Sequence, residues 1–358
     1  MSFRDRTKSA LKDLLESQGE DAAADMIGDM LESKEVRPED FSIREIWEAT
    51  NPGVNLQEAV ASSAFPKITG ELINSKVMSA YDGVAKIGDQ LVTTVSSNVQ
   101  QETIAGFTEA ETPEEVGEGQ EYNDSTFTEK FVTIRNKKFG RMISVTEEMI
   151  YFDKTGQILA RANRIGTKAA QYREMLILNG IQDINSNVYA PSGVPTAFYS
   201  AANGNLATVN AFDEAGMQTV TRLAHLQKDD SLGDEADDYI MIDENNAIVI
   251  VPKELELAAW QLANSVLTPE SAEQATNFYK GRFRILTSPY VTAQNASTWY
   301  WGNFKEDFWW TEVWPLQTMA QAAGADNAFT KDIKMRAKVR FFGNIGALDV
   351  RHSYKSTA

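Results

Sequence analysis

The sequence predicts a protein that combines α-helices with β-strands, and three features support this. Apolar residues recur at helical spacing within residues 8–50 and again between residues 158 and 176. Residues 334–341 alternate between basic and apolar side chains, which is typical of a strand with one charged face. Hydrophobic residues make up 42% of the 358 residues, which is ordinary for a chain with a folded core.

The composition excludes several classes of functional site. Because the chain has no cysteine, it cannot form a disulfide framework, an iron–sulfur cluster or a thiol nucleophile. Its two histidines, His225 and His352, lie far apart in the sequence and belong to no metal-ligand spacing. The nucleophile-elbow, phosphate-loop and dinucleotide-binding motifs are missing as well. We therefore expect no catalytic residue, no metal and no cofactor, and hence a protein that is not an enzyme.

Charge and hydropathy limit the partners of the chain. The formal net charge of −17 argues against a protein whose main role is to grip a phosphate backbone. The N-terminus carries charges where a signal peptide needs an apolar core. The longest uncharged stretch, residues 184–212, is rich in Asn, Ser and Gly and therefore indicates a loop rather than a membrane helix. We expect a soluble, non-secreted protein that does not associate with membranes.

Residues 8–50 are predicted to form a small helical layer. Three groups of apolar residues each share one helix face: Leu11, Leu14 and Leu15; Ala23, Ile27, Met30 and Leu31; Ile43, Ile46 and Trp47. Pro38 suits a helix start, and residues 51–53 form a stop signal. From residue 65 to residue 106 no periodicity is strong, so we expect an extended arm that lies along other surfaces.

The stretch from residue 106 to residue 145 separates its charges into two limbs. Between Asp89 and Glu129 there are ten acidic residues and no basic one, and a purely basic run follows. The basic limb is rich in strand formers, so we expect a long hairpin. Because an isolated two-stranded hairpin is marginal in water, it is either a flexible surface loop or an arm that a neighbouring subunit orders. We favour the arm.

A long helix is predicted to follow this hairpin. Ser144 and Glu147 have the spacing of a capping box, and Gly180 marks the helix end. Its apolar face is expected to contain Ile158, Ala162, Ile165, Ala169, Tyr172 and Leu176. Its basic face is expected to contain Arg161, Arg164 and Lys168. We expect the basic face to be solvated rather than bound to nucleic acid.

The rest of the chain is predicted to alternate helices with short strands. The expected elements are a helix over 212–227, strands over 239–242 and 247–251, a helix after Pro252, and a strand over 283–286. The acidic run at 229–238 lacks the spacing of a calcium loop. Five of the seven tryptophans fall within residues 299–314, and we expect them in the core or a subunit interface rather than at a stacking site.

The order of these parts resembles the major capsid protein family of tailed bacteriophages, whose fold is shared with encapsulins. The run similar to that family's extended hairpin, or E-loop, and to the approach to its spine helix is ETPEEVGEGQEYNDSTFTEKFVTIRNKKFGRMISVTEEMI. The run similar to its axial strand, proline and helix is YIMIDENNAIVIVPKELELAAWQLANS. The runs similar to its late peripheral strands and closing segment are FRILTSPYVTAQNASTWYWGNF and KDIKMRAKVRFFGNIGALDVRHSYK.

The resemblance implies an α+β tailed-phage major capsid fold. Its expected parts are an N-terminal helical segment (1–64), an N-terminal arm (65–105), an extended hairpin (106–145), a peripheral domain with the spine helix (146–204 and 285–358) and an α/β axial domain (205–284), to which the C-terminal end may return. The implied function is self-assembly into the pentamers and hexamers of an icosahedral shell around double-stranded DNA, which the shell encloses without sequence-specific binding. The implied location is the virion, after assembly in the host cytoplasm.

The implied partners are further copies of the chain, together with portal, scaffolding or decoration proteins. We expect the hairpin to contact neighbouring copies through its charged residues, which are Glu109, Glu111, Glu114, Glu115, Glu118, Glu121, Arg135, Lys137, Lys138 and Arg141. Two alternatives remain open. One is an encapsulin-like nanocompartment shell, and the other is an acidic carbohydrate-acting enzyme that uses the C-terminal tryptophan cluster.

Overall fold

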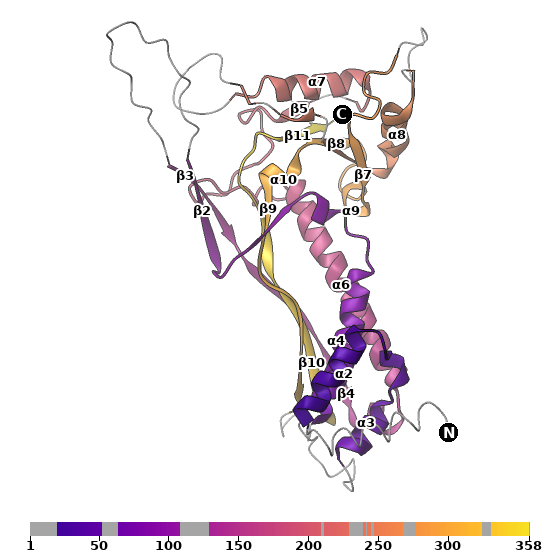
Figure 1. The fold of residues 1–358 in the computed structure, drawn as a ribbon. Coiled ribbons are helices and arrows are strands. Elements are labelled where there is room, and N and C mark those ends of the chain that lie inside the picture. Colours follow the sequence, from indigo (N-terminus) through magenta and orange to yellow (C-terminus); the bar gives the residue numbers. More distant parts are fainter. Residues whose placement is uncertain are drawn as a thin grey trace, which may run out of the picture. The chain divides into compact units, whose positions relative to one another are not determined.

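The structure, a computed structural model, describes residues 20–51, 64–107, 129–208, 211–228, 239–240, 242–244, 247–267, 276–323 and 331–357. The described residues form two compact units (Figure 1). Unit 1 draws on the ranges 1–85, 138–173 and 314–342, and unit 2 draws on the ranges 86–137, 174–313 and 343–358. These two units are groups of residues in mutual contact and are not the expected domains. The expected domain boundaries stay a prediction. No helix in the described ranges is long and apolar enough to cross a membrane.

The helices are α2 (Glu20–Glu32), α3 (Ile43–Thr50), α4 (Ala64–Asp82), α5 (Glu147–Tyr151), α6 (Thr155–Ile181), α7 (Glu214–His225), α8 (Glu256–Asn264), α9 (Pro289–Thr292) and α10 (Phe304–Asp307). The strands are β1 (Thr93–Ser96), β2 (Gln101–Phe107), β3 (Glu129–Arg135), β4 (Lys137–Thr146), β5 (Leu206–Thr208), β6 (Ile248–Val251), β7 (Arg284–Thr287), β8 (Thr298–Gly302), β9 (Phe308–Ala322), β10 (Ile333–Ala347) and β11 (Ser353–Thr357). They form three sheets, with strand orders β1-β9-β10-β4, β5-β11-β8-β6-β7 and β2-β3. This mixture of helices and strands confirms the predicted class.

The helical layer predicted before residue 51 is confirmed for the residues described. The apolar positions expected to share helix faces in α2 and α3 are buried, with Met30 half-buried: Ala23, Ile27, Leu31, Ile43, Ile46 and Trp47. Ser42 caps α3 by accepting a hydrogen bond from the Glu45 amide, and α3 ends at Thr50, next to the predicted stop signal. The three leucines predicted between residues 11 and 15 lie outside the described residues.

The extended arm predicted from residue 65 is wrong over most of its first half, because helix α4 occupies residues 64–82. Its buried residues follow helical spacing and are Phe65, Ile68, Thr69, Leu72, Ile73 and Val77. Thr69 within this face, and the glycine and serine between its positions, dilute the apolar pattern in the sequence. Packing holds the helix in place, since a Cβ added to Gly70 would lie 2.6 Å from the Cβ atom of Ala320 in β9.

Helix α6 confirms the predicted long helix, with 27 residues. The predicted capping box is wrong, because β4 continues to Thr146 and the short helix α5 follows it directly. The buried face is also shifted, since it passes through Gly166 and Ala170 rather than through Tyr172, which is 39% exposed. The three basic residues at positions 161, 164 and 168 are exposed, as expected.

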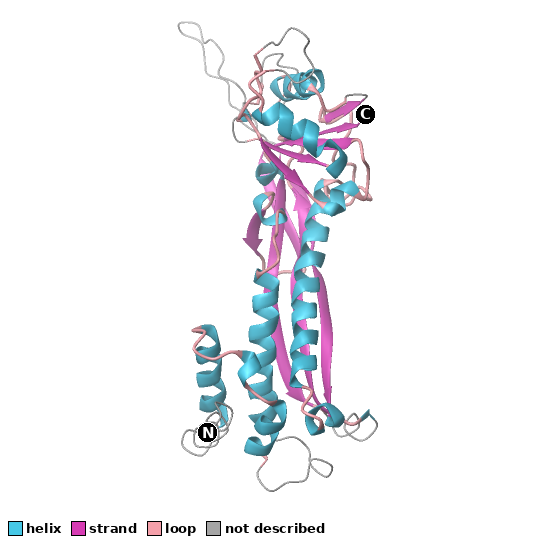
Figure 2. Ribbon diagram, turned by 90° about the vertical axis from the view of Figure 1, so that its right-hand side faces the viewer, coloured by secondary structure: helices cyan, strands magenta, loops and turns pink. Residues whose placement is uncertain are grey.

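Close backbone contact explains this shift. Helices α4 and α6 lie side by side (Figure 2), and a Cβ added to Gly166 would lie only 2.3 Å from the carbonyl oxygen of Val77. A position with so little space requires glycine, which has no side chain. The face of α6 that packs against α4 is therefore marked by small residues rather than by large apolar ones.

Strand β10 shows the alternation predicted for residues 334–341. Its inward residues Met335, Ala337, Val339 and Phe341 are buried, while Lys338 is exposed. Lys334 departs from the pattern, because its side chain is buried and its Nζ lies 3.2 Å from a carboxylate oxygen of Glu147. The exposed basic side of β10 therefore begins after Lys334.

The five-stranded sheet lies in the core of unit 2. All residues of β6 and β8 are buried, and α7 and α8 pack against one face of the sheet, where Trp299 and Trp301 lie. This confirms the prediction that the tryptophans contribute to the core. The strand predicted over residues 239–242 is wrong for the residues described, because Tyr239 forms only an isolated bridge with Lys228. The acidic run at 229–238 lies outside the described residues.

Candidate functional site

The predicted contact residues fall into two groups. The six glutamates between residues 109 and 121 lie outside the described residues. The four basic residues are described and exposed, and they are Arg135, Lys137, Lys138 and Arg141. Within the described ranges none of the four forms an ion pair.

Strands β2 and β3 form an antiparallel pair on either side of residues 108–128. On one face of this hairpin, Val132 and Ile134 are buried. On the other face, Phe131 is 40% exposed and Arg135 is also exposed. Since alternate strand residues point to opposite faces, the hairpin packs with one face and leaves the other open.

The basic residues do not all belong to this hairpin. Arg135 ends β3, whereas the three others lie in β4, which neighbours β10 at the edge of the four-stranded sheet. The expected single basic limb is thus divided between two sheets, and the paired hairpin ends at Arg135 rather than at residue 145. The physical reason is Asn136, which interrupts the strand between them.

Asn136 anchors this branch point within unit 2. Its side chain is buried, and its Nδ2 donates a hydrogen bond of 2.9 Å to the carbonyl oxygen of Val99. Its Oδ1 accepts a hydrogen bond from Thr311 Oγ1, while Asn344 Nδ2 donates to the carbonyl oxygen of Arg135 at 2.9 Å. Segments remote in sequence therefore hold the base of the hairpin in one place. A lone asparagine between strands carries no signal by which the sequence could have predicted this role.

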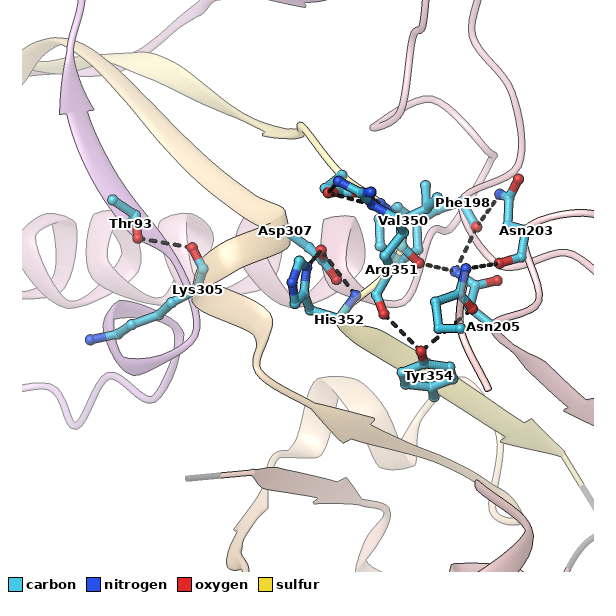
Figure 3. A network of polar contacts seen from close by, with 12 residues as sticks. Thr93, Phe198, Asn203, Asn205, Lys305, Asp307, Val350, Arg351, His352 and Tyr354 are labelled. Atoms are coloured by element: carbon cyan, nitrogen blue, oxygen red, sulfur yellow. Dashed lines mark hydrogen bonds and ion pairs between the residues drawn. The ribbon is translucent and has the colours of Figure 1, made fainter. Parts of the chain in front are cut away.

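A second polar network surrounds the entry to β11 (Figure 3). Asn205 is fully buried, and its Nδ2 donates to the carbonyl oxygens of Phe198 at 3.0 Å and Val350 at 2.9 Å. Tyr354 Oη donates to the carbonyl oxygen of Arg351 at 2.7 Å. These contacts satisfy buried polar groups and fix the position of the C-terminal strand beside β5 and β8. The C-terminal strand thus lies in the sheet that contains β6, and its assignment to an axial domain stays a prediction.

Asp307 and His352 form a partly buried acid–base pair in the same network (Figure 3). Asp307 Oδ1 lies 3.1 Å from His352 Nδ1 and accepts a hydrogen bond of 3.3 Å from the His352 amide. Burial raises the pKa of Asp307 to about 6, although the contact with His352 acts in the opposite direction. Burial by itself would lower the pKa of His352, but the contact with Asp307 outweighs it and raises that pKa. The Asp307 side chain is fully buried and that of His352 is 22% exposed, and their contact joins the residue before β11 to α10.

The described residues contain no cluster of three or more residues that could hold a metal ion. Trp299, Trp301 and Trp310 are buried, so their rings are not available to stack on a sugar or a base. An open cavity of about 950 Å³ lies between α7 and α8, but His225 at its edge is exposed and pairs with Glu244 at 2.9 Å. The exposed surfaces of the β2–β3 hairpin and of the four-stranded sheet are therefore the better candidates for function.

Comparison with known proteins gives matches at the level of family and fold. A family model described as phage capsid protein matches residues 130–356. The capsid structure of Cyanophage P-SCSP1u is 12% identical and covers 76% of this chain and 88% of that chain, with a TM-score of 0.50. The capsid of a native GTA particle is 14% identical, with coverages of 77% and 91% and a TM-score of 0.49. A virus-like particle from Pyrococcus furiosus is 7% identical, with coverages of 79% and 97% and a TM-score of 0.45. Curated protein sequences give no match.

Proposed function

Because the chain belongs to the phage capsid protein family, we propose that its copies assemble as pentamers and hexamers into an icosahedral shell that encloses double-stranded DNA. The chain is a structural component of the virion, and it has no catalytic role. Assembly takes place in the host cytoplasm, where portal, scaffolding or decoration proteins join the shell. The net charge of −17 supports a shell that encloses DNA without gripping its phosphates.

One observation carries this proposal, and it is the open face of the β2–β3 hairpin. The hairpin combines an exposed aromatic residue, Phe131, with the exposed charge of Arg135, and a strongly acidic sequence connects its two strands. A hairpin that buries only one face gains stability when a further surface covers the other. In a shell, a neighbouring copy supplies that surface.

The first test is assembly of the wild-type protein. We expect sedimentation velocity at micromolar concentration to show capsomers or larger particles, and negative-stain electron microscopy to show closed shells. A compact monomer in every salt concentration, and no shells by microscopy, would overturn the proposal.

The second test reverses the basic residues at the base of the hairpin. Changing Arg135, Lys137 and Lys138 together to Glu should block or misdirect assembly while circular dichroism and melting temperature stay nearly unchanged. Each exposed ion pair contributes only about 0–1 kcal/mol, but many symmetric contacts add up in a shell. The matched control reverses Arg161, Arg164 and Lys168 on α6, which changes the net charge equally. Normal shells from the hairpin variant would contradict its proposed contact role.

Neither alternative function gains support. A nanocompartment shell would share the fold but enclose protein, so particles that contain DNA separate it from a phage capsid. A carbohydrate-acting enzyme would need accessible tryptophans, whereas three of the C-terminal ones are buried.

A further inference from the structure

Helix α6 carries three exposed cations on one side. Arg161, Arg164 and Lys168 are exposed, and their spacing of three and four positions places them on the same face of the helix. Arg164 and Lys168 each stand two positions from Gly166, which packs against α4. Since two positions turn about 200° around a helix, these cations point away from α4. We call the three residues the basic face of α6.

Within the described residues, no acidic side chain neutralises the basic face of α6. The one acid of the helix, Glu174, is buried, and its carboxylate accepts hydrogen bonds of 3.0 Å from the amides of Ile87 and Gly88. None of the three cations forms an ion pair in the described ranges. Lys168 Nζ instead donates a hydrogen bond of 2.8 Å to Gln171 Oε1. Such a group of cations in a chain of net charge −17 suits an anionic partner.

The basic face of α6 lacks an apolar anchor of the kind that a protein partner uses. Among the large apolar side chains of α6, all of whose residues are described, only Tyr172 is exposed, and its ring already contacts that of Phe139 at 5.2 Å. The other exposed side chains between residues 157 and 168 are Gln157, Ala160 and Asn163. Protein interfaces concentrate their binding energy in aromatic and other large anchors, whereas a phosphate backbone is bound by cations and hydrogen-bond donors alone.

The dimensions of the basic face also fit a phosphate backbone. From Arg161 to Lys168 the helix rises by about 10 Å, and double-stranded DNA carries one charge per about 1.7 Å of its axis. Each cation therefore meets a phosphate without bending of either partner. We propose that the basic face of α6 contacts the phosphates of the double-stranded DNA that the shell encloses. This inference rests on the proposed function, because it assigns the surface of the chain that lies against the enclosed DNA.

The contact is weak in each copy and does not depend on the DNA sequence. Three neutralised phosphates lower the affinity with rising salt by a log–log slope of about 2.7, which is small beside that of a dedicated DNA-binding protein. A weak contact of this size agrees with a chain of net charge −17 that does not grip its DNA. The solvated face expected from the sequence then describes the subunit before DNA is enclosed.

Lysine labelling tests the contact inside the particle. DNA-filled and DNA-free shells of the wild type are treated with an acetylating reagent, and the modified lysines are identified by mass spectrometry. We expect Lys168 to be acetylated several-fold more slowly in filled shells, because phosphates cover its ammonium group. Lys280, which is exposed in unit 2, is the internal control and should react equally in both. Equal rates for Lys168 in the two kinds of shell would overturn the inference.

Neutralising the basic face tests the same contact without a shell. Binding of the subunit to a fluorescent 20-base-pair duplex is measured by fluorescence anisotropy between about 25 and 200 mM salt. Arg161→Gln, Arg164→Gln and Lys168→Gln together should weaken binding about tenfold or more at the lowest salt and reduce the salt slope by about 2.7. Arg161→Lys with Arg164→Lys keeps the charges and should bind nearly as the wild type does. Circular dichroism shows whether each variant is folded.

The matched control for this variant removes three exposed cations of unit 2, Arg222→Gln, Lys228→Gln and Lys280→Gln, and changes the net charge equally. It should weaken binding of the duplex by less than about threefold. Equal losses in the two variants, or a wild type that binds no duplex, would overturn the inference. A labelled peptide of glutamates that binds the basic face as tightly as the duplex does would also overturn it, because an acidic protein would then be the partner.

These outcomes separate the inference from the proposed function. If the wild-type chain forms no shells, the proposed function fails. If it forms DNA-filled shells in which Lys168 is no less reactive than in empty ones, only the inference fails.

Discussion

The five-stranded sheet and the four-stranded sheet use their faces in different ways. In unit 2, β6 and β8 are buried along their whole length, and rings pack on both faces of the sheet, with Trp301 on one and Tyr300 on the other. In the part of the four-stranded sheet that belongs to unit 1, helices cover one face of β4, β9 and β10, and the other face carries exposed basic and methionine side chains. A sheet buried on both faces supplies stability, whereas a sheet buried on one face also supplies a surface for a partner.

The largest expected effect comes from breaking the doubly buried sheet. Trp301 is 2% exposed, and its ring lies 5.8 Å from that of Tyr354 in β11. Trp301→Ala should lower the free energy of unfolding by about 3–5 kcal/mol, because a large buried ring leaves a cavity. Urea unfolding followed by circular dichroism measures this change. Trp260→Ala, at a position 58% exposed on α8, should change it by less than about 1 kcal/mol. Similar losses for both variants would show that burial in this sheet is not the source of the stability.

A smaller effect is expected at α6, which lies on the covered face of the four-stranded sheet. Gly166→Ala places a Cβ against the Val77 carbonyl oxygen and should destabilise the protein by about 1–3 kcal/mol. Gly156→Ala in the same helix meets no atom within 4 Å and should stabilise it by up to about 1 kcal/mol. The two variants therefore differ in sign in the same unfolding measurement. Stabilisation by Gly166→Ala would contradict the close contact between α4 and α6.

The pH dependence of stability tests the burial of Asp183 in unit 2. Asp183 Oδ2 accepts a hydrogen bond of 2.7 Å from the Phe198 amide, yet burial raises the pKa of Asp183 to about 6. Since the unfolded pKa is about 3.9, the folded state binds this proton more tightly than the unfolded state does. The contribution of Asp183 to the free energy of unfolding therefore falls as pH rises from about 4 to above 6, by about 1 kcal/mol for this partly exposed group.

Asp183→Asn isolates this contribution, because the amide keeps an oxygen acceptor for Phe198 and carries no charge. We expect the variant to be more stable than the wild type at pH 8 and similar to it at pH 4. Denaturant unfolding across that range measures the difference. A difference that does not depend on pH would refute the raised pKa of Asp183.

The smallest effect on stability is expected on the open face of the four-stranded sheet. Lys338 is exposed, so Lys338→Glu should change the free energy of unfolding by less than about 0.5 kcal/mol. The free energy of unfolding is measured on the same variant subunit that is used in the assembly assays. An unchanged value shows that a loss of shells reflects a lost contact between subunits and not a lost fold. A loss of several kcal/mol would mean that Lys338 supports the fold rather than a contact with a partner.

Much of the local structure was predictable from sequence, and the misses share a cause. The long helix α6, the alternation in β10 and the burial of the tryptophans follow from periodicity and composition. Helix α4 and the buried face of α6 were missed because their contact surfaces depend on small residues such as Gly70 and Gly166, which carry no hydrophobic signal. The anchor at Asn136 was missed because hydrogen-bond partners remote in the chain decide its role.

The candidate contact surface divides in the same way. The sequence by itself determined the separation of charge, since residues 109–121 are acidic and the basic residues alternate along residues 334–341. Only the tertiary structure decided that Lys138 joins Arg336, Lys338 and Arg340 on one open face, because β4 and β10 are remote in sequence and neighbours in the sheet. Local periodicity determines which side of a strand is polar, but the partner strand is selected by long-range hydrogen bonds and packing that no local pattern records.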